Sequence, residues 1–203
     1  MPSPFYLFIG AASFPVVRGL YRLRSRGAEN VPATGGCVLA ANHNSNFDPW
    51  PLGIPLFPRR HLRFMAKSEL FNPVLKPFIL AGGGFPVRRD QADLEAIETA
   101  VQFCRKGEIV VMFPEGTRRK KGLRKRYEAR PRTGAARIAL EAGVPLVPAA
   151  IGGTDRLARL ARLRVAYGVA IDVSDLQDME PRQASQIATD RLMASIGELE
   201  ASL

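Results

Sequence analysis

The chain contains two histidines, and one of them, His43, lies in a segment that suggests acid–base chemistry. Asp48 follows His43 by five residues, a spacing that on an ideal helix would hold the two side chains about 140° apart. The asparagines and the serine between them favour a turn instead. We expect this turn to fold Asp48 onto one imidazole nitrogen, so that the other can take a proton from a substrate hydroxyl. Ser45 has no second histidine nearby to activate it, and we interpret it as a turn former.

The His43–Asp48 spacing is weak evidence alone, and three further segments make it specific. Residues 42–48 resemble the first signature of the glycerolipid acyltransferase family, which includes the bacterial 1-acylglycerol-3-phosphate acyltransferases. Residues 113–118 resemble its third signature at all six positions. Residues 83–89 and 147–151 resemble the second and fourth more loosely. Because the four segments occur in family order, the chain is identified by resemblance as a member of this family.

The resemblance implies a reaction. A fatty acyl group moves from an acyl thioester, on coenzyme A or acyl carrier protein, to the sn-2 hydroxyl of 1-acylglycerol 3-phosphate, giving phosphatidic acid. His43 is then the general base, and Asp48 fixes its tautomer and stabilises the imidazolium. The thioester is a co-substrate, and no cofactor or metal is expected. Glycerol 3-phosphate or another lysolipid is the alternative acceptor, because the family shares its signatures across these substrates.

The second and third signatures imply the site for the acceptor and its phosphate. Gly116 permits close approach of the backbone to an anion, and arginine side chains match the geometry of phosphate. The second signature of the family ends in a single arginine, and either Arg88 or Arg89 could correspond to it. We prefer Arg89, because it is the last residue of the matching segment 83–89. Arg132 precedes a predicted helix and is a candidate for an accessory phosphate contact. The expected acceptor-binding residues are Arg88, Arg89, Glu115, Gly116, Thr117 and Arg118.

The charge of the chain favours anionic partners. The net charge is +10, and nine basic residues between 118 and 132 are opposed only by Glu128. Lysophospholipid, the acyl donor and a membrane surface are the expected partners. Nucleic acid is the alternative from composition, but no nucleic-acid motif is visible and none is expected. A non-catalytic basic protein that binds membranes or nucleic acid is the competing functional class, and it predicts that His43→Ala leaves function intact.

Apolar runs of strand length alternate with helical patterns, which favours an α/β domain with a mostly parallel central sheet flanked by helices. Strands are expected over 37–41, 62–66, 85–88, 109–113 and 146–151, with one or two more in 163–173. Helices are expected from the spacing of apolar residues over 94–104, over 133–142 and from Pro181 onward. Three polar clusters, at 42–48, 114–118 and 152–155, follow strands, where ligands bind in such sheets.

The first 26 residues are expected to form an N-terminal membrane-associating helical segment, with the acyltransferase domain over 27–203. The apolar run is shorter than the roughly 20 residues that span a bilayer. Its aromatic residues and the arginines that follow it suit an anionic membrane interface. We expect the cytoplasmic face of the cell membrane, with peripheral or monotopic attachment. Cys37 and Cys104 suggest neither a disulfide framework nor a zinc site, and they fit a reducing compartment.

Overall fold

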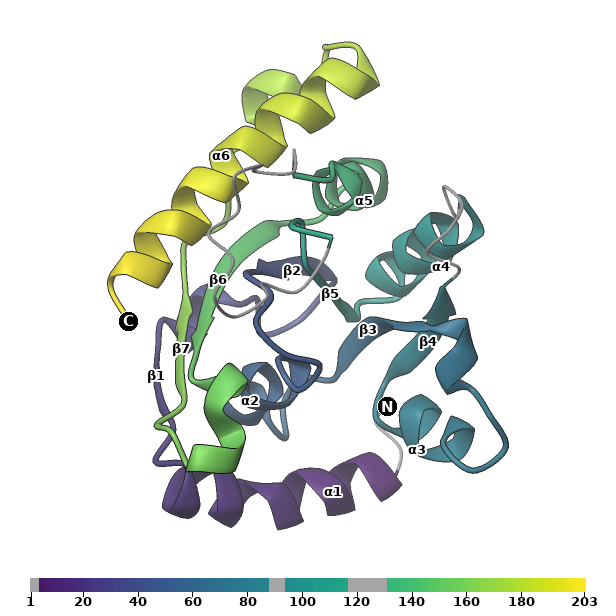
Figure 1. The fold of residues 1–203 in the computed structure, drawn as a ribbon. Helices are drawn as coiled ribbons and strands as arrows, with labels where there is room; N and C mark the ends of the chain where they lie inside the picture. Colours follow the sequence, from purple (N-terminus) through teal and green to yellow (C-terminus); the bar gives the residue numbers. More distant parts are fainter. Residues whose placement is uncertain (1–3, 88–93, 117–130) are drawn as a thin grey trace.

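A computed structural model describes residues 4–87, 94–116 and 131–203 of the chain (Figure 1). Seven strands form one sheet in the order β1-β7-β6-β2-β5-β3-β4. Neighbouring strands are parallel except β6 and β7, which run antiparallel. The predicted single α/β domain with a mostly parallel sheet is therefore confirmed. The strands are β1 (Arg24–Arg26), β2 (Cys37–Ala41), β3 (Leu62–Lys67), β4 (Gly84–Val87), β5 (Ile109–Met112), β6 (Leu146–Gly152) and β7 (Arg164–Tyr167).

The strand predicted over 37–41 forms β2, at the centre of the sheet between β5 and β6. All five of its residues are buried, as expected of a parallel strand covered on both faces. Cys37, Leu39 and Ala41 pack into the hydrophobic cluster on one face, and Val38 and Ala40 pack into the cluster on the other. The residues that follow β2 therefore start from the buried centre of the sheet.

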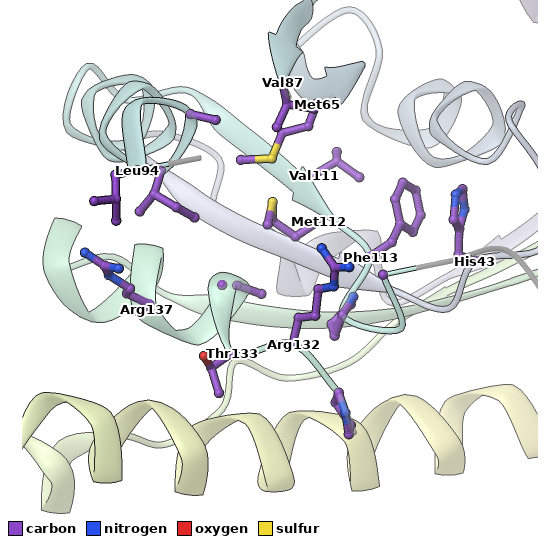
Figure 2. A pocket seen from close by; sticks show the side chains of 17 residues that line it. His43, Met65, Val87, Leu94, Val111, Met112, Phe113, Arg132, Thr133 and Arg137 are labelled. Atoms are coloured by element: carbon purple, nitrogen blue, oxygen red, sulfur yellow. The ribbon is translucent and has the colours of Figure 1, made fainter. Parts of the chain in front are cut away.

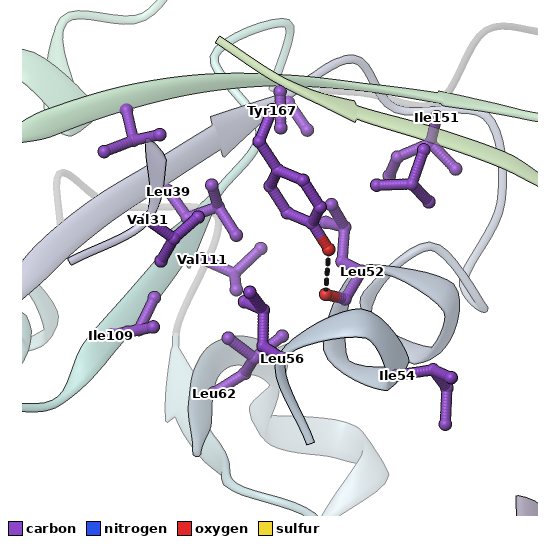
Figure 3. Packing of buried hydrophobic residues seen from close by; sticks show 14 of the residues in the cluster. Val31, Leu39, Leu52, Ile54, Leu56, Leu62, Ile109, Val111, Ile151 and Tyr167 are labelled. Atoms are coloured by element: carbon purple, nitrogen blue, oxygen red, sulfur yellow. Dashed lines mark hydrogen bonds between the residues drawn. The ribbon is translucent and has the colours of Figure 1, made fainter. Parts of the chain in front are cut away.

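Helices cover both faces of the sheet (Figure 1). α4, α5 and α6 pack together over one hydrophobic cluster. α2 packs over the other, where the Tyr167 hydroxyl donates a 2.6 Å hydrogen bond to the Leu52 carbonyl oxygen (Figure 3). This bond satisfies the polar end of a buried aromatic ring and ties α2 to β7. The helices are α1 (Pro4–Pro15), α2 (Pro49–Gly53), α3 (Lys76–Ala81), α4 (Leu94–Arg105), α5 (Gly134–Ala142) and α6 (Pro181–Ala201).

Local sequence signals predict most of these boundaries. α5 ends at Gly143, whose φ of 65° is the left-handed conformation that glycine adopts readily. Residues 163–173 contain one strand, β7. Sequence patterns did not predict the short helices α2 and α3, which span too few turns to show a helical period.

The apolar helix expected near the N-terminus is present as α1, which contains no charged residue and buries none of its residues. Among the described residues, no helix combines the length and apolarity needed to cross a bilayer. β1 lies at the end of the segment 1–26 and pairs in parallel with β7, so this segment is continuous with the sheet. Its association with a membrane stays a prediction.

Candidate active site

His43 and Asp48 lie in the turn that follows β2, and the expected hydrogen bond between them is present. The His43 Nδ1 atom is 2.8 Å from Asp48 Oδ2. His43 is 6% exposed and Asp48 is fully buried. Ser45 shapes the turn as expected, because its hydroxyl accepts a hydrogen bond from the Phe47 backbone N–H at 3.3 Å. Since Nδ1 donates to the carboxylate, the neutral imidazole carries its lone pair on Nε2.

The Asp48 carboxylate accepts hydrogen bonds from four groups. Its Oδ2 atom accepts from His43 Nδ1 and from the backbone N–H groups of Asn44 and Ser45, at 2.7 Å and 2.9 Å respectively for the last two. Its Oδ1 atom accepts from the Thr154 hydroxyl at 2.5 Å. These four donors satisfy the oxygen atoms of a carboxylate that is fully buried. The arrangement therefore holds a negative charge against the imidazole and fixes its orientation.

Two residues that sequence patterns left without a role hold this turn in place. The Asn42 side chain exchanges two hydrogen bonds with the Ile151 backbone: Oδ1 accepts from the N–H at 2.8 Å, and Nδ2 donates to the carbonyl at 3.0 Å. Asn44 Nδ2 donates to the same carbonyl at 2.9 Å. These bonds tie the end of β2 to the end of β6, and Thr154 lies two residues after β6. Polar clusters after both strands were visible in the sequence, but the pairing between them depends on strand order.

The His43 ring stacks on the ring of Phe113, with centroids 4.2 Å apart and planes 18° from parallel. Phe113 follows β5, the neighbour of β2, so adjacent strands deliver the two rings. Both residues line a cavity of about 490 Å³ (Figure 2). The stacking orients the imidazole plane, while Asp48 engages Nδ1. Nε2 is thus the nitrogen available for a group bound in the cavity.

Arg132 is the basic residue that the structure places beside the third signature. Its backbone N–H donates to the Pro114 carbonyl at 2.8 Å, and its side chain lines the same cavity as His43. Gly116 has a φ of 69°, and a Cβ atom there would lie 2.6 Å from Arg132 Nε. The close approach that Gly116 permits is therefore to the guanidinium of Arg132. Glu115 lies half-buried in the same turn.

The remaining predicted acceptor-binding residues are not among those described. Arg88 and Arg89 follow β4, and Thr117 and Arg118 follow Gly116, all in segments outside the described residues. Their roles stay predictions. The structure thus brings His43, Gly116 and Arg132 to one cavity, with Asp48 buried behind His43, while Glu115 lies next to Gly116 without lining the cavity.

One wall of the cavity is apolar (Figure 2). Side chains from β3, β4, β5 and α4 form this wall, and the polar groups of His43, Arg132 and Arg137 lie elsewhere in the lining. A cavity with an apolar wall and a few polar groups suits a ligand with a hydrocarbon portion and a polar head. The apolar lining includes Met65, Val87, Leu94, Ile97, Val111 and Met112.

Known proteins share both sequence and fold with the chain. Residues 22–152 match the acyltransferase family model. The 1-acyl-sn-glycerol-3-phosphate acyltransferase of Bacillus subtilis (strain 168) is 31% identical over 179 residues, which cover 86% of each chain. The protein of that name from Streptococcus pneumoniae is 30% identical over 74% of this chain and 56% of its own length. A crystal structure of the 1-acyl-sn-glycerophosphate (LPA) acyltransferase from Thermotoga maritima shares the fold, with a TM-score of 0.65, 23% identity, and coverage of 96% of this chain and 78% of that one.

Proposed function

The chain belongs to the acyltransferase family, and on that premise we propose that it transfers a fatty acyl group from an acyl thioester to the sn-2 hydroxyl of 1-acylglycerol 3-phosphate, giving phosphatidic acid. An enzyme of this family is not the non-catalytic basic protein that composition alone allowed. The acceptor is supported by the names of the relatives from Bacillus subtilis and Streptococcus pneumoniae. The observation that carries the proposal is the oriented His43–Asp48 pair at a cavity with an apolar wall.

His43 Nε2 is the proposed general base. It takes the proton of the acceptor hydroxyl as the hydroxyl oxygen attacks the thioester carbonyl carbon. The tetrahedral intermediate collapses, the carbon–sulfur bond breaks, and the imidazolium returns its proton to the leaving thiolate. Asp48 stabilises the imidazolium and holds its tautomer throughout, because its carboxylate is fixed by other donors. No acyl group is attached to the protein in this sequence of steps.

The cavity supports a placement for the two substrates. Its apolar wall suits an acyl chain, since burying hydrocarbon is favourable by about 0.8 kcal/mol for each methylene group. Arg132 lines the cavity with His43 and is the proposed contact for the acceptor phosphate, with Arg89, Arg88 and Arg118 as further proposed contacts. Both coenzyme A and acyl carrier protein are retained as donors, and glycerol 3-phosphate or another lysolipid is retained as an alternative acceptor.

The proposed location is the cytoplasmic face of the cell membrane, with the segment 1–26 as the attachment. α1 supports this because it is apolar all round and leaves large side chains exposed: Phe8 is 69% exposed. A helix of this composition gains free energy at a bilayer interface, where its side chains leave water. The proposed acceptor and product are themselves membrane lipids, so attachment would bring enzyme and substrate to one surface.

Thiol release by the purified full chain tests the proposed function. The panel consists of acyl-CoA and acyl carrier protein thioesters as donors, and 1-acylglycerol 3-phosphate, glycerol 3-phosphate and a lysophosphatidylcholine as acceptors. We expect release with 1-acylglycerol 3-phosphate, and a loss of about 10²- to 10⁴-fold in His43→Ala, the range for a general base. His61→Phe alters the other histidine and should retain activity. Wild-type release no faster than the His43→Ala background would refute the proposal.

A further inference from the structure

Two segments far apart in the sequence bring eight arginines to one edge of the sheet. Residues 18–26 and 156–164 each carry four arginines and no acidic residue. β1 pairs with β7, placing Arg24 directly opposite Arg164. Leu163 N donates to the Tyr21 carbonyl, and Arg24 N donates to the Leu163 carbonyl, both at 3.0 Å. All eight arginines are exposed, and we call them the arginine surface: Arg18, Arg22, Arg24, Arg26, Arg156, Arg159, Arg162 and Arg164.

Within the part of the chain that the structure describes, one of the eight arginines, Arg156, forms an ion pair, and Arg26 and Arg164 donate hydrogen bonds to oxygen atoms of Ser202 and Leu203. Like charges opposite one another on neighbouring strands destabilise a sheet, which makes the Arg24–Arg164 pair costly. Among the described residues, Arg24, Arg159 and Arg162 form no hydrogen bond or ion pair through their side chains. Arg156 has an acidic neighbour in Asp155, at 3.7 Å. Repulsion of this kind is relieved when an anion binds.

Unusual backbone conformations concentrate at the same surface. Arg22 has a φ of 47° and Leu160 a φ of 50°, and they are the two non-glycine residues with positive φ in the described part of the chain. Each costs on the order of 1 kcal/mol, because the Cβ atom crowds the backbone in this conformation. Leu160 is the C-cap of the short helix Thr154–Arg159, and both residues lie within or between the arginines of the surface.

The segment 156–164 repeats Arg-Leu-Ala, and two of its three leucines face the core while Leu160 is 44% exposed. Leu157 packs against the hydrophobic core and Leu163 is fully buried, while the arginines between and around them are exposed. The surface also adjoins apolar residues at the end of the N-terminal helical region: Leu20 is 50% exposed, and the Arg18 guanidinium lies 5.2 Å from the Phe14 ring centroid. Arginines therefore border an exposed apolar helix.

We propose that the arginine surface binds the phosphate groups of anionic phospholipids in the bilayer whose acyl region receives α1. The inference rests on the proposed function, and it adds the residues 156–164, which lie far in sequence from the predicted attachment segment. Guanidinium groups match phosphate oxygens in pairs, and they are weakly hydrated. An acidic carrier protein is the other polyanion to consider. The bilayer fits better because the surface continues into an apolar helix, and apolar insertion with basic side chains is the combination that gives stable membrane binding.

Vesicle flotation of the purified full chain tests this surface. Vesicles of phosphatidylcholine are compared with vesicles that also contain phosphatidylglycerol. The variant R24Q/R159Q/R162Q removes three charges whose side chains have no partner among the described residues. Its matched control, R105Q/K106Q/R182Q, removes three exposed charges from the end of α4, the loop after it and the start of α6, none of which belongs to the arginine surface. A third variant, R24K/R159K/R162K, keeps the charge and reports whether these positions tolerate substitution.

We expect wild type to prefer the anionic vesicles and to lose that preference in high salt. Each basic residue near an anionic surface is worth about five-fold in binding, so R24Q/R159Q/R162Q should bind anionic vesicles about 100-fold more weakly. Its binding to phosphatidylcholine, which depends on α1, should be unchanged. The control and the lysine variant should stay within a few-fold of wild type. Equal losses in R24Q/R159Q/R162Q and the control would overturn the proposal, because net charge alone would then explain the binding.

Thiol release in detergent micelles separates this inference from the proposed function. R24Q/R159Q/R162Q should release thiol at the wild-type rate with acyl-CoA and detergent-dispersed 1-acylglycerol 3-phosphate. An inactive wild type would refute the proposed function whatever the vesicles show. Wild-type vesicle binding by the variant, together with a selective loss of activity toward acyl carrier protein thioesters, would overturn the lipid assignment in favour of the carrier protein.

Discussion

Four donors converge on the Asp48 carboxylate, and this convergence sets the geometry of His43. Two are backbone N–H groups of the turn, which any sequence that forms the turn supplies. The third is the imidazole itself, and the fourth is the Thr154 hydroxyl, which arrives from the other side of the β2–β6 pair. At the residue scale, the candidate base is oriented by a short network in which one member is distant in sequence.

Thr154→Val should weaken the orientation of His43 without removing any group from the reaction. Valine has the shape of threonine but leaves the buried Asp48 Oδ1 without its donor, at a cost of about 1–3 kcal/mol. We expect kcat to fall about ten-fold, equivalent to about 1.4 kcal/mol in the barrier, and KM to change little. Thr154→Ser keeps the hydroxyl and should keep most of the activity. Steady-state thiol release measures both, and an unchanged kcat in Thr154→Val would contradict the role.

Gly116→Ala should displace Arg132. The new Cβ atom would lie 2.6 Å from Arg132 Nε, and the φ of 69° disfavours any side chain. We expect a rise in KM for the phosphate-bearing acceptor and a loss of about 1–2 kcal/mol in the free energy of unfolding. Gly35→Ala is the matched control, since Gly35 also has a positive φ, of 74°, but open space around it. If the two variants raised KM equally, the contact with Arg132 would not be responsible.

At the scale of elements, the cavity lies where β3, β4 and β5 meet α4 and the start of α5. Helix α4 is amphipathic: Ala100, Val101 and Cys104 are buried against the sheet. Ile97, one turn earlier, lines the cavity together with Met65 and Met112. The depth available to an acyl chain therefore depends on a few side chains carried by regular elements. Substitutions there should change chain-length preference without touching His43.

Ile97→Phe should shorten the acyl chain that the enzyme prefers. The larger ring occupies part of the apolar wall, and loss of room for two methylene groups costs about 1.6 kcal/mol, or about 15-fold in kcat/KM for the longest donors. Shorter donors should be affected little. Glu98→Phe puts the same ring on an exposed position of α4 and serves as the control. The measurement is the rate of thiol release with acyl-CoA donors of increasing acyl-chain length. An equal loss of activity at every length would show that the acyl chain does not bind against Ile97.

At the scale of the whole molecule, α1 contacts the sheet through a small polar cluster at the start of β3. The His61 and Tyr6 rings meet edge to face, with centroids 4.1 Å apart. Burial lowers the pKa of His61 to about 4, with the positive charge of Arg63 adding to the effect and Glu108 opposing it. The His61 Nε2 atom is buried and has no hydrogen-bond partner among the described residues. The neutral imidazole is therefore the form that the fold accepts.

Stability should fall as the solution is acidified through the pKa that His61 has in the unfolded chain. The folded-state pKa of about 4 is below the ordinary value of 6.5, so the unfolded state binds the proton more tightly. The contribution of neutral His61 to the free energy of unfolding is fully present above about pH 6.5, and it is lost progressively as the pH falls toward about 4. Allowing for partial contact with solvent, we expect a loss of about 2 kcal/mol in the free energy of unfolding.

Urea denaturation at several pH values measures this dependence. His61→Phe keeps an aromatic contact with Tyr6 and cannot titrate, so its stability should vary less over the same range. Other groups also titrate there, and the difference between wild type and variant isolates His61. Parallel curves for the two proteins would show that His61 does not contribute.

The sequence by itself determined the fold class, the order of the main elements and the hydrogen-bonded pair of His43 and Asp48. Apolar runs report burial on both faces of a parallel sheet, and their alternation with helical periods is a local property of the chain. The turn between His43 and Asp48 is likewise local, because the Ser45 and Asp48 side chains accept hydrogen bonds from backbone N–H groups two or three residues away. Short helices such as α2 were not predicted, because one or two turns are too few to show a helical period of apolar residues.

Only the tertiary structure decided which distant residues meet. Strand order places β6 beside β2, and this brings Asn42 to Ile151 and Thr154 to Asp48. Strand order also explains the arginine surface. The pairing of β1 with β7 brings the arginines of residues 18–26 next to those of residues 156–164. Contacts across a sheet depend on the register of strands separated by more than a hundred residues, and no local pattern carries that information.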